Sequence, residues 1–265
     1  MENTSAFSAE DLLVRLAGNS VVGKNVHCYQ SATSTNDIGH SLAKAGAADG
    51  TLITAEFQTR GKGRGGNVWQ SEQSENITFS LVLRPKADAA KISLLPLMAA
   101  LAVAQAIETV LQRKSEIKWP NDVLIDRKKI CGILLESAIS GSSVEYVILG
   151  IGVNVNQAAF PEEIMNQATS LRLSAGQSFS RAEVMEELSK KLDIWYLAFC
   201  KGAFDAILDG WRSYADMLGK EISFLYNGER LNGTAQDIDE QGCLIVLAGS
   251  KPLCLSQAEI SNVRY

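Results

Sequence analysis

The 265-residue chain has few of the residues that build metal centres and disulfide frameworks. It contains two histidines and five cysteines, and no two cysteines form a Cys-x-x-Cys pair. An odd number of widely spaced cysteines is typical of reduced thiols in a cytoplasm rather than of a disulfide scaffold. With so few histidines beside them, the cysteines offer little material for a zinc site. We therefore expect a cytoplasmic protein whose structure does not depend on disulfides.

Positive charge and long apolar runs are also scarce. The 25 Lys and Arg residues are outnumbered by 30 Asp and Glu residues, which gives a formal net charge of -5. A broad nucleic-acid surface needs an excess of cations to neutralise phosphates. The N-terminus has no signal-peptide pattern, and the most apolar run, residues 92–107, is interrupted by Pro96 and Gln105 and is too short to span a bilayer. We expect neither nucleic acid nor a membrane as a partner.

The most informative stretch is a glycine-rich loop at residues 58–69. Between Arg60 and Gly66 it holds four glycines and three cations, directly after a strand-like run at residues 51–57. Glycines let the backbone approach a ligand closely, and Arg60, Lys62 and Arg64 are donors suited to an anion. The same glycines make the loop costly to order. We expect a loop that binds an anion and is mobile until it does so.

Two nucleotide-binding motifs match this loop by pattern but fail by context. The run from Gly61 to Gly66 satisfies Gly-x-Gly-x-x-Gly, and Val68 completes the kinase form of that loop. A dinucleotide loop must open a helix, whereas residues 77–83 alternate like a strand. The kinase catalytic motifs are missing around His27 and His40. An RGG-like nucleic-acid tether and a plain solvated turn remain as alternatives.

Polar side chains and glycines also occur together in one segment before the glycine-rich loop and in three segments after it. Residues 31–37 join a strand at 25–29 to a helix and offer hydroxyls, an amide and free N–H groups, although simple helix capping also explains them. Residues 116–122 form an extended segment that is stopped by Pro120 and followed by an Asn-Asp turn. Strands at 123–125 and 130–135 flank a hairpin turn, where Lys128 and Lys129 are explained equally well as a solvated tip. A strand at 144–155 carries two glycines and an amide.

The remaining elements predict two domains. Helices are expected at residues 92–112, 180–200 and 204–218. From residue 219 the pattern changes to short strands with tight turns, which indicates a small β-barrel. We expect a large domain at residues 1–218 and a barrel at residues 219–265.

Taken together, these motifs resemble the signatures of biotin protein ligases in order and approximate spacing. The resemblance covers roughly residues 25–265, and the glycine loop joined to Lys-Trp-Pro-Asn-Asp is its most specific part. The matching positions are Ser34-Thr35-Asn36, Gln58, the loop Gly61-Lys62-Gly63-Arg64-x-Gly66, Trp69, Lys118-Trp119-Pro120-Asn121-Asp122, Lys129, Gly132 and Gly150-x-Gly152-x-Asn154.

The resemblance implies an α/β (α+β) fold, with a mixed-sheet catalytic domain like those of class II aminoacyl-tRNA synthetases and biotin synthetases, followed by an SH3-like barrel. It implies an AMP-forming ligase that converts biotin and ATP into biotinyl-5'-AMP and passes the acyl group to a lysine of a biotin carboxyl carrier protein domain of a carboxylase. ATP and Mg²⁺ are the implied cofactors. A monomer and a homodimer are both left open.

The resemblance also assigns roles to residues. Arg64 and Lys129 are the expected catalytic residues, and Asp122 is expected near a Mg²⁺ that the protein alone does not fix. The expected biotin-binding residues are Ser34, Thr35, Asn36, Gln58, Gly61, Lys62, Arg64, Gly132, Gly150 and Gly152. The expected ATP-binding residues are Arg64, Trp69, Asn121, Asp122, Lys129 and Asn154. The thiol of Cys131, beside this pocket, is expected only to pack.

The loop departs from the family pattern at two positions. Lys62 replaces an arginine and keeps the charge without the planar two-pronged donor, while Asn67 replaces an arginine and removes a charge. We therefore expect looser retention of biotinyl-AMP than in an all-arginine loop. Only 33 residues precede Ser34, so we also expect a form without the DNA-binding domain of some relatives. A lipoate or octanoyl transfer enzyme of the same broad fold is the nearest alternative.

Overall fold

A seven-stranded mixed sheet forms the centre of the larger part of the molecule. The computed structural model describes residues 6–140, 143–226, 228–256 and 260–264. The strand order is β1-β2-β3-β7-β6-β5-β4, with β1 parallel to β2 and all the other neighbours antiparallel. The strands are β1 (Val26–Tyr29), β2 (Thr51–Ala55), β3 (Ile77–Leu83), β4 (Glu116–Lys118), β5 (Asp122–Ile125), β6 (Lys128–Ser140) and β7 (Ser143–Val153).

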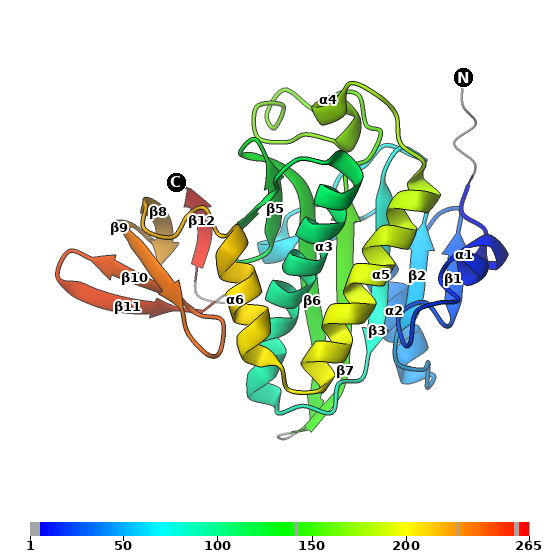
Figure 1. The fold of residues 1–265 in the computed structure, drawn as a ribbon, viewed down its shortest axis with the longest axis horizontal. Helices are drawn as coiled ribbons and strands as arrows, with labels where there is room; N and C mark the ends of the chain where they lie inside the picture. The colour runs from blue at the N-terminus through cyan, green and yellow to red at the C-terminus, as the bar shows by residue number, and fades with distance from the viewer. Residues whose placement is uncertain (1–5, 141–142, 227, 257–259, 265) are drawn as a thin grey trace.

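Helices cover both faces of this sheet (Figure 1). Three of them, α3 (Leu95–Leu111), α5 (Arg181–Cys200) and α6 (Phe204–Tyr214), lie across one face, while α2 (Thr35–Lys44) packs against β3 and β7 on the other. Every residue of β3 is buried, because this central strand is covered on both sides. The short helices α1 (Ala9–Arg15) and α4 (Leu171–Ala175) lie outside these layers.

The most apolar segment of the chain is the core helix. Residues Ala89–Leu111 are long and apolar enough to cross a membrane by composition, yet 78% of their most apolar window is buried inside the protein. The expected helix at residues 92–112 is therefore present, but its α-helical part begins only at Leu95. The preceding 3₁₀-helix η2 (Ala89–Leu94) is capped by the side chain of Asp88, which accepts from the Ala90 N–H. Contact with α5, α6 and the sheet explains the apolar surface of α3.

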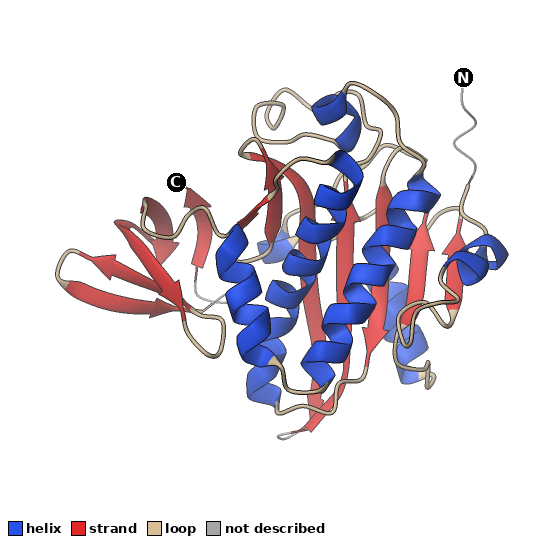
Figure 2. Ribbon diagram, viewed as in Figure 1, coloured by secondary structure: helices blue, strands red, loops and turns tan. Residues whose placement is uncertain are grey.

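The chain ends in a second, five-stranded antiparallel sheet of order β11-β10-β9-β8-β12 (Figure 2). Its strands are β8 (Glu221–Tyr226), β9 (Glu229–Ile238), β10 (Leu244–Ala248), β11 (Lys251–Leu255) and β12 (Ile260–Arg264). The helix expected to run to residue 218 ends at Tyr214, and a turn leads from there into β8. The predicted class, a mixed α/β fold followed by a small β domain, is confirmed.

A buried ion pair ties the first described residues to the rest of the domain. Arg181, at the start of α5, lies 2.8 Å from the carboxylate of Glu56, and both side chains are only 2% exposed. The other oxygen of Glu56 accepts the Phe7 N–H at 2.7 Å, and the Arg181 guanidinium stacks over the Phe7 ring. This cluster holds the end of β2, from which the glycine-rich loop departs.

Candidate active site

The N-terminus of α2 meets the start of the glycine-rich loop. Ser34 caps the helix by accepting the Asn36 N–H, and the Thr35 N–H donates to the side-chain oxygen of Gln58 at 2.7 Å. The Thr35 hydroxyl lies 3.2 Å from the same oxygen. The structure therefore brings Ser34-Thr35-Asn36 and Gln58 together, as expected. Capping, the simpler interpretation, also holds, but for Ser34 only.

Two paired glycines let side chains lie directly on the sheet. Gly132 of β6 is opposite Gly152 of β7, and Leu134 is opposite Gly150. A Cβ atom on Gly150 would lie 2.3 Å from Oδ1 of Asn36, and one on Gly132 would lie 3.0 Å from both Trp69 and Lys129. The close approach predicted at these glycines is thus made by the protein's own side chains, and contact with biotin there stays a prediction.

Lys62 fastens the loop to α2 and β6. Its Nζ lies 2.6 Å from Asp37 and 3.5 Å from Glu136, and the hydrogen bond to Asp37 is the main reason that the pKa of Lys62 is raised. Glu136 also accepts a hydrogen bond of 2.6 Å from Nδ2 of Asn36 and lies 3.6 Å from the His40 ring. In this structure the ammonium of Lys62 thus serves to close the loop.

Glu136 was not among the predicted site residues, although the sequence contains a signal for it. Side chains along a strand alternate between faces, so Glu136 shares a face with Gly132 and Leu134. A partly buried carboxylate on the glycine-bearing face of a strand is costly unless it has a partner. The expected strand ended at residue 135, one residue before Glu136, so the prediction did not include it, whereas the observed strand continues to Ser140.

The glycine-rich loop closes on itself like a small hairpin. The Gly63 N–H donates to the Asn67 carbonyl at 2.8 Å, and the Trp69 N–H donates to the Gly61 carbonyl at 3.0 Å. Within the 3₁₀ turn η1 (Arg64–Gly66), Gly65 has a φ of 61°, which favours glycine. The Asn67 side chain donates to the carbonyl of Arg64 at 2.8 Å. The sequence predicted only that Asn67 removes a charge from the loop. In the structure its side chain also stabilises the turn.

Cations and one carboxylate gather below this loop. Lys129 Nζ lies 2.6 Å from Asp122 and 5.6 Å from the centre of the Trp69 ring. Arg64 donates to Oδ1 of Asn121 at 3.3 Å, and burial lowers the pKa of its guanidinium while Asp122 opposes that shift. The predicted residues Arg64, Trp69, Asn121, Asp122 and Lys129 are therefore neighbours. Lys129 does not belong to a solvated tip, because Asp126 and Arg127, both with positive φ, make the turn.

Asn154 and Trp119 play structural parts. Asn154 is 4% exposed, and its Nδ2 donates to the Thr169 carbonyl at 3.0 Å. Trp119 is fully buried, and its Nε1 donates to the carbonyl of Gly242 at 3.0 Å, which connects the Lys-Trp-Pro-Asn-Asp segment to the C-terminal sheet. Asn121 and Asp122 are the residues of this segment that face the cations.

Burial raises the pKa of the Cys131 thiol far above its usual value, as suits a packed side chain.

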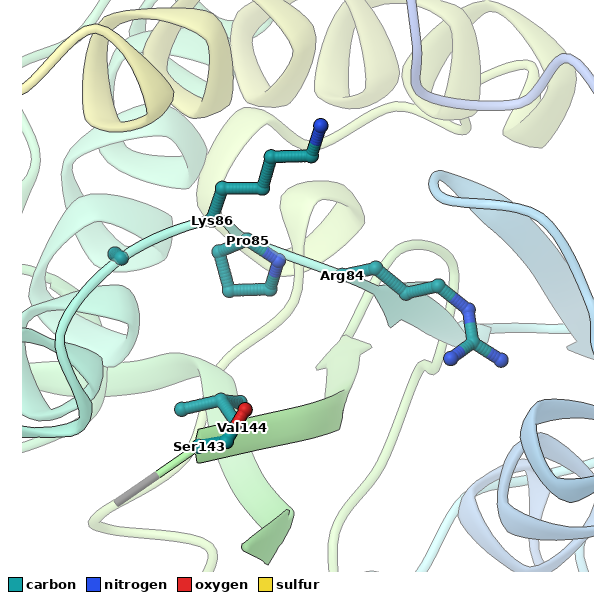
Figure 3. A pocket seen from close by; sticks show the side chains of 6 residues that line it. Arg84, Pro85, Lys86, Ser143 and Val144 are labelled. Atoms are coloured by element: carbon teal, nitrogen blue, oxygen red, sulfur yellow. The ribbon is translucent and has the colours of Figure 1, made fainter.

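An open pocket lies at the other end of β3 and β7 (Figure 3). Arg84 and Lys86 point away from each other there, and Arg84 is occupied by the backbone carbonyls of Ala43, Ala47 and Glu145. Because its polar groups do not converge, this pocket adds nothing to the site. The lining residues are Arg84, Pro85, Lys86, Ala87, Ser143 and Val144.

The fold and the site define an α/β enzyme in which a cationic glycine loop closes over a lysine–carboxylate pair. Residues 27–154 match the biotin/lipoate A/B protein ligase family, and residues 217–261 match the biotin protein ligase C terminal domain. The chain belongs to the biotin protein ligase family.

Individual relatives agree with this assignment. The bifunctional ligase/repressor BirA of Bacillus subtilis is 38% identical over 85% of this chain and 70% of its own length. The biotin–(acetyl-CoA-carboxylase) ligase of Paracoccus denitrificans is 32% identical over 86% and 96%. Among solved structures, the biotin protein ligase of Aquifex aeolicus in complex with biotin and ATP has a TM-score of 0.79 and 31% identity, over 91% of this chain and 99% of that one.

Proposed function

We propose that this protein joins biotin to ATP as biotinyl-5'-AMP and then transfers the biotinyl group to one lysine of a biotin carboxyl carrier protein. The observation that carries the proposal is the cluster of Arg64, Asn121, Asp122 and Lys129 beside the glycine-bearing strands. The names of the relatives support it, since the Paracoccus denitrificans protein is a biotin–(acetyl-CoA-carboxylase) ligase and the Aquifex aeolicus enzyme was solved with biotin and ATP.

In the first step the biotin carboxylate attacks the α-phosphorus of ATP, and pyrophosphate leaves. Negative charge accumulates around that phosphorus, so cations fixed beside it stabilise the transition state. We assign this role to Arg64 and Lys129. Asp122 holds Lys129 in position before substrate binds, and the stacking of Lys129 near Trp69 limits its rotamers. Both cations are therefore largely positioned before substrate arrives.

We assign the biotin head group to the site where α2 meets the loop. Ser34, Thr35 and Gln58 supply hydroxyl and amide groups there. The Asn36 amide lies on Gly150 and is held at both ends, since Nδ2 donates to Glu136 and Oδ1 accepts from the Ser80 hydroxyl at 2.6 Å. The glycines at 61, 132, 150 and 152 keep this region free of Cβ atoms.

The nucleotide is assigned to the opposite side of the pair formed by Arg64 and Lys129. Trp69 offers its ring to the adenine side, and Asn121 offers its amide to the phosphates. Asn154 keeps its amide oxygen and one amide hydrogen for the nucleotide, because the other hydrogen of Nδ2 is donated to the Thr169 carbonyl.

The residues around the phosphates fit a Mg²⁺ that arrives with ATP. Mg²⁺ is commonly held by one or two carboxylates together with substrate phosphates. Asp122 supplies one carboxylate here, and its partner Lys129 can move to a phosphate when the ion is present. Bound Mg²⁺ would neutralise part of the charge on the pyrophosphate leaving group.

In the second step the lysine amine of the carrier attacks the acyl carbon, and AMP leaves. The mixed anhydride must be kept from water until that lysine arrives, and a closed loop excludes water. The contacts of Lys62 with Asp37 and Glu136 supply the closure. No covalent enzyme intermediate is needed.

We further propose that residues 1–218 form the catalytic unit and residues 219–265 the barrel, which the two sheets and the two separate family matches support. We place the protein in the cytoplasm as a monomer or homodimer. With a formal net charge of -5, we expect these 265 residues not to bind operator DNA. A gel shift with biotinyl-AMP checks this, and sequence-specific retardation would contradict it.

The experiment that tests the function is exchange of labelled pyrophosphate into ATP. Biotin should support the exchange, and lipoate should not. Exchange with lipoate alone would assign the protein to the lipoate branch of the wider family. Absence of exchange with either acid would reject the proposed function.

A further inference from the structure

The C-terminal sheet contains a cluster of potential metal ligands, none of which is among the residues assigned to ATP and biotin. Asp239, in the turn after β9, lies beside Cys243, just before β10, and Cys254 of β11. One ligand atom from each of the three lies within 4.8 Å of the other two. Among the described residues this is the one group of three His, Cys, Asp or Glu side chains with such spacing. Two thiols and a carboxylate are a donor set suited to zinc.

The carboxylate of Asp239 is already held in position. Its Oδ1 accepts the N–H groups of Gln241 and Cys243, each at 2.9 Å. Its Oδ2 lies 3.2 Å from Sγ of Cys254, which donates to it. One oxygen therefore fixes the turn, while the other lies beside a thiol. A carboxylate held in this way needs little reorganisation to bind a cation.

The strand register favours a metal ion over a disulfide between the two cysteines. Cys254 is directly opposite Ile245, so Cys243, two residues earlier, is its diagonal neighbour on the same face. Diagonal neighbours in a sheet are roughly 7–8 Å apart, and a disulfide usually needs Cα atoms within about 6.8 Å. Tetrahedral zinc with Zn–S bonds of about 2.3 Å instead places its sulfurs on the order of 3.8 Å apart. Small side-chain rotations from the present positions reach that spacing.

We propose that Asp239, Cys243 and Cys254 bind one thiophilic divalent cation such as Zn²⁺, with solvent in the fourth position. Cys254 is exposed and Asp239 and Cys243 are partly exposed, so the ion has direct access. Each thiol that binds releases its proton to solvent. The site does not depend on the ligase assignment, because none of its residues belongs to the proposed catalytic cluster.

The ion would stiffen the turn through which the two domains touch. In that turn Gly242 accepts the hydrogen bond from Trp119, and Gln241 accepts one of 2.7 Å from the Ser93 hydroxyl. Lys91 donates to the Glu240 carbonyl at 3.1 Å. A metal that links this turn to β11 thus braces the contact with the Lys-Trp-Pro-Asn-Asp segment.

Cobalt titration of the untagged, metal-free full-length protein tests the proposal. Reduced wild-type protein, with all five thiols counted after denaturation, should develop thiolate-to-cobalt charge-transfer absorption that saturates at one Co²⁺ per chain, and Zn²⁺ should abolish it. Cys254→Ser and Asp239→Asn should lose the saturable signal. The asparagine variant keeps an Oδ1 acceptor for the turn, and circular dichroism checks that both variants fold.

Cys200→Ser is the control, because Cys200 is also exposed but lies at the end of α5, outside the cluster. It should titrate like the wild type. The proposal is overturned if the fully reduced wild-type protein shows no thiolate–cobalt absorption, or if the signal persists unchanged in folded Cys254→Ser.

Discussion

The indole of Trp69 lies against Gly152, so closely that a Cβ atom on Gly152 would be 2.4 Å from Cε2 of the indole. The two residues are 83 positions apart in the sequence (152 minus 69), yet each constrains the other. Trp69 is the last residue of the glycine-rich loop and Gly152 belongs to β7, so their contact fixes the end of the loop relative to the sheet. The same indole lies 5.6 Å from the ammonium of Lys129.

A methyl group on Gly152 should displace the Trp69 ring and so disturb the active site. Gly152→Ala should displace the Trp69 ring and lower biotin-dependent pyrophosphate exchange by about 100-fold, the loss expected when reacting groups move by roughly 1 Å. Exchange kinetics and Trp fluorescence would measure the two effects. Gly18→Ala is the control, because a Cβ atom there meets nothing within 4 Å. Equal activity of both variants would contradict the constraint.

Substitution of Lys129 should lower the turnover of pyrophosphate exchange far more than substitution of Lys128. Lys129→Ala removes a cation held beside Asp122, and the turnover of pyrophosphate exchange should fall about 10²- to 10³-fold, as for loss of a transition-state donor. Lys128→Ala, which changes an exposed lysine of the same strand, should leave the turnover unchanged. A loss confined to the Michaelis constant for ATP would instead assign Lys129 to ground-state binding.

A positive charge added at position 67 should make the glycine-rich loop retain biotinyl-AMP more tightly. Asn67→Arg should slow release of biotinyl-AMP by up to about fivefold, because an exposed ion pair contributes about 0.2–1 kcal/mol. Stopped-flow release from preloaded enzyme measures the rate. Asn67→Ala loses the hydrogen bond to Arg64 without gaining a charge, and it should release the intermediate at least as fast as the wild type. Release from the wild type that is as slow as from Asn67→Arg, or slower, would refute the prediction.

The buried ion pair between Arg181 and Glu56 should be important for stability. Arg181→Met leaves a buried carboxylate without its cation and should lower the free energy of unfolding by about 3–5 kcal/mol. Arg15→Met removes a partly exposed cation that pairs with Asp11 and Glu186, and it should cost no more than about 1 kcal/mol. Urea unfolding compares the two. If both variants lost a similar free energy of unfolding, burial of the Arg181–Glu56 pair would have no special effect on stability.

The sequence predicted the parts of the site that are made of local patterns. The strand before the glycine-rich loop, the strand after it and the alternation of residues 150–154 each depend on near neighbours. These patterns placed Thr35, Gln58, Gly132 and Gly152 in the elements where the structure has them. The resemblance to the family then indicated which of these elements meet.

The contacts that were missed connect residues distant in the sequence. Glu136 gains its importance from Asn36 and Lys62, which lie 100 and 74 positions away, and no local pattern shows such a pairing. The hydrogen bond of Trp119 to Gly242 spans 123 positions. Spacing along the chain likewise does not show that Asp239, Cys243 and Cys254 converge.

The proposed function is tested most directly by transfer of biotin to a carrier. Purified enzyme, biotin, ATP and an unmodified biotin carboxyl carrier domain should yield carrier heavier by one biotinyl group on a single lysine, as seen by mass spectrometry. Omission of either biotin or ATP, or replacement of that lysine by arginine, should abolish the mass gain. An unmodified carrier in the complete reaction, or one modified by lipoate in place of biotin, would contradict the proposed function.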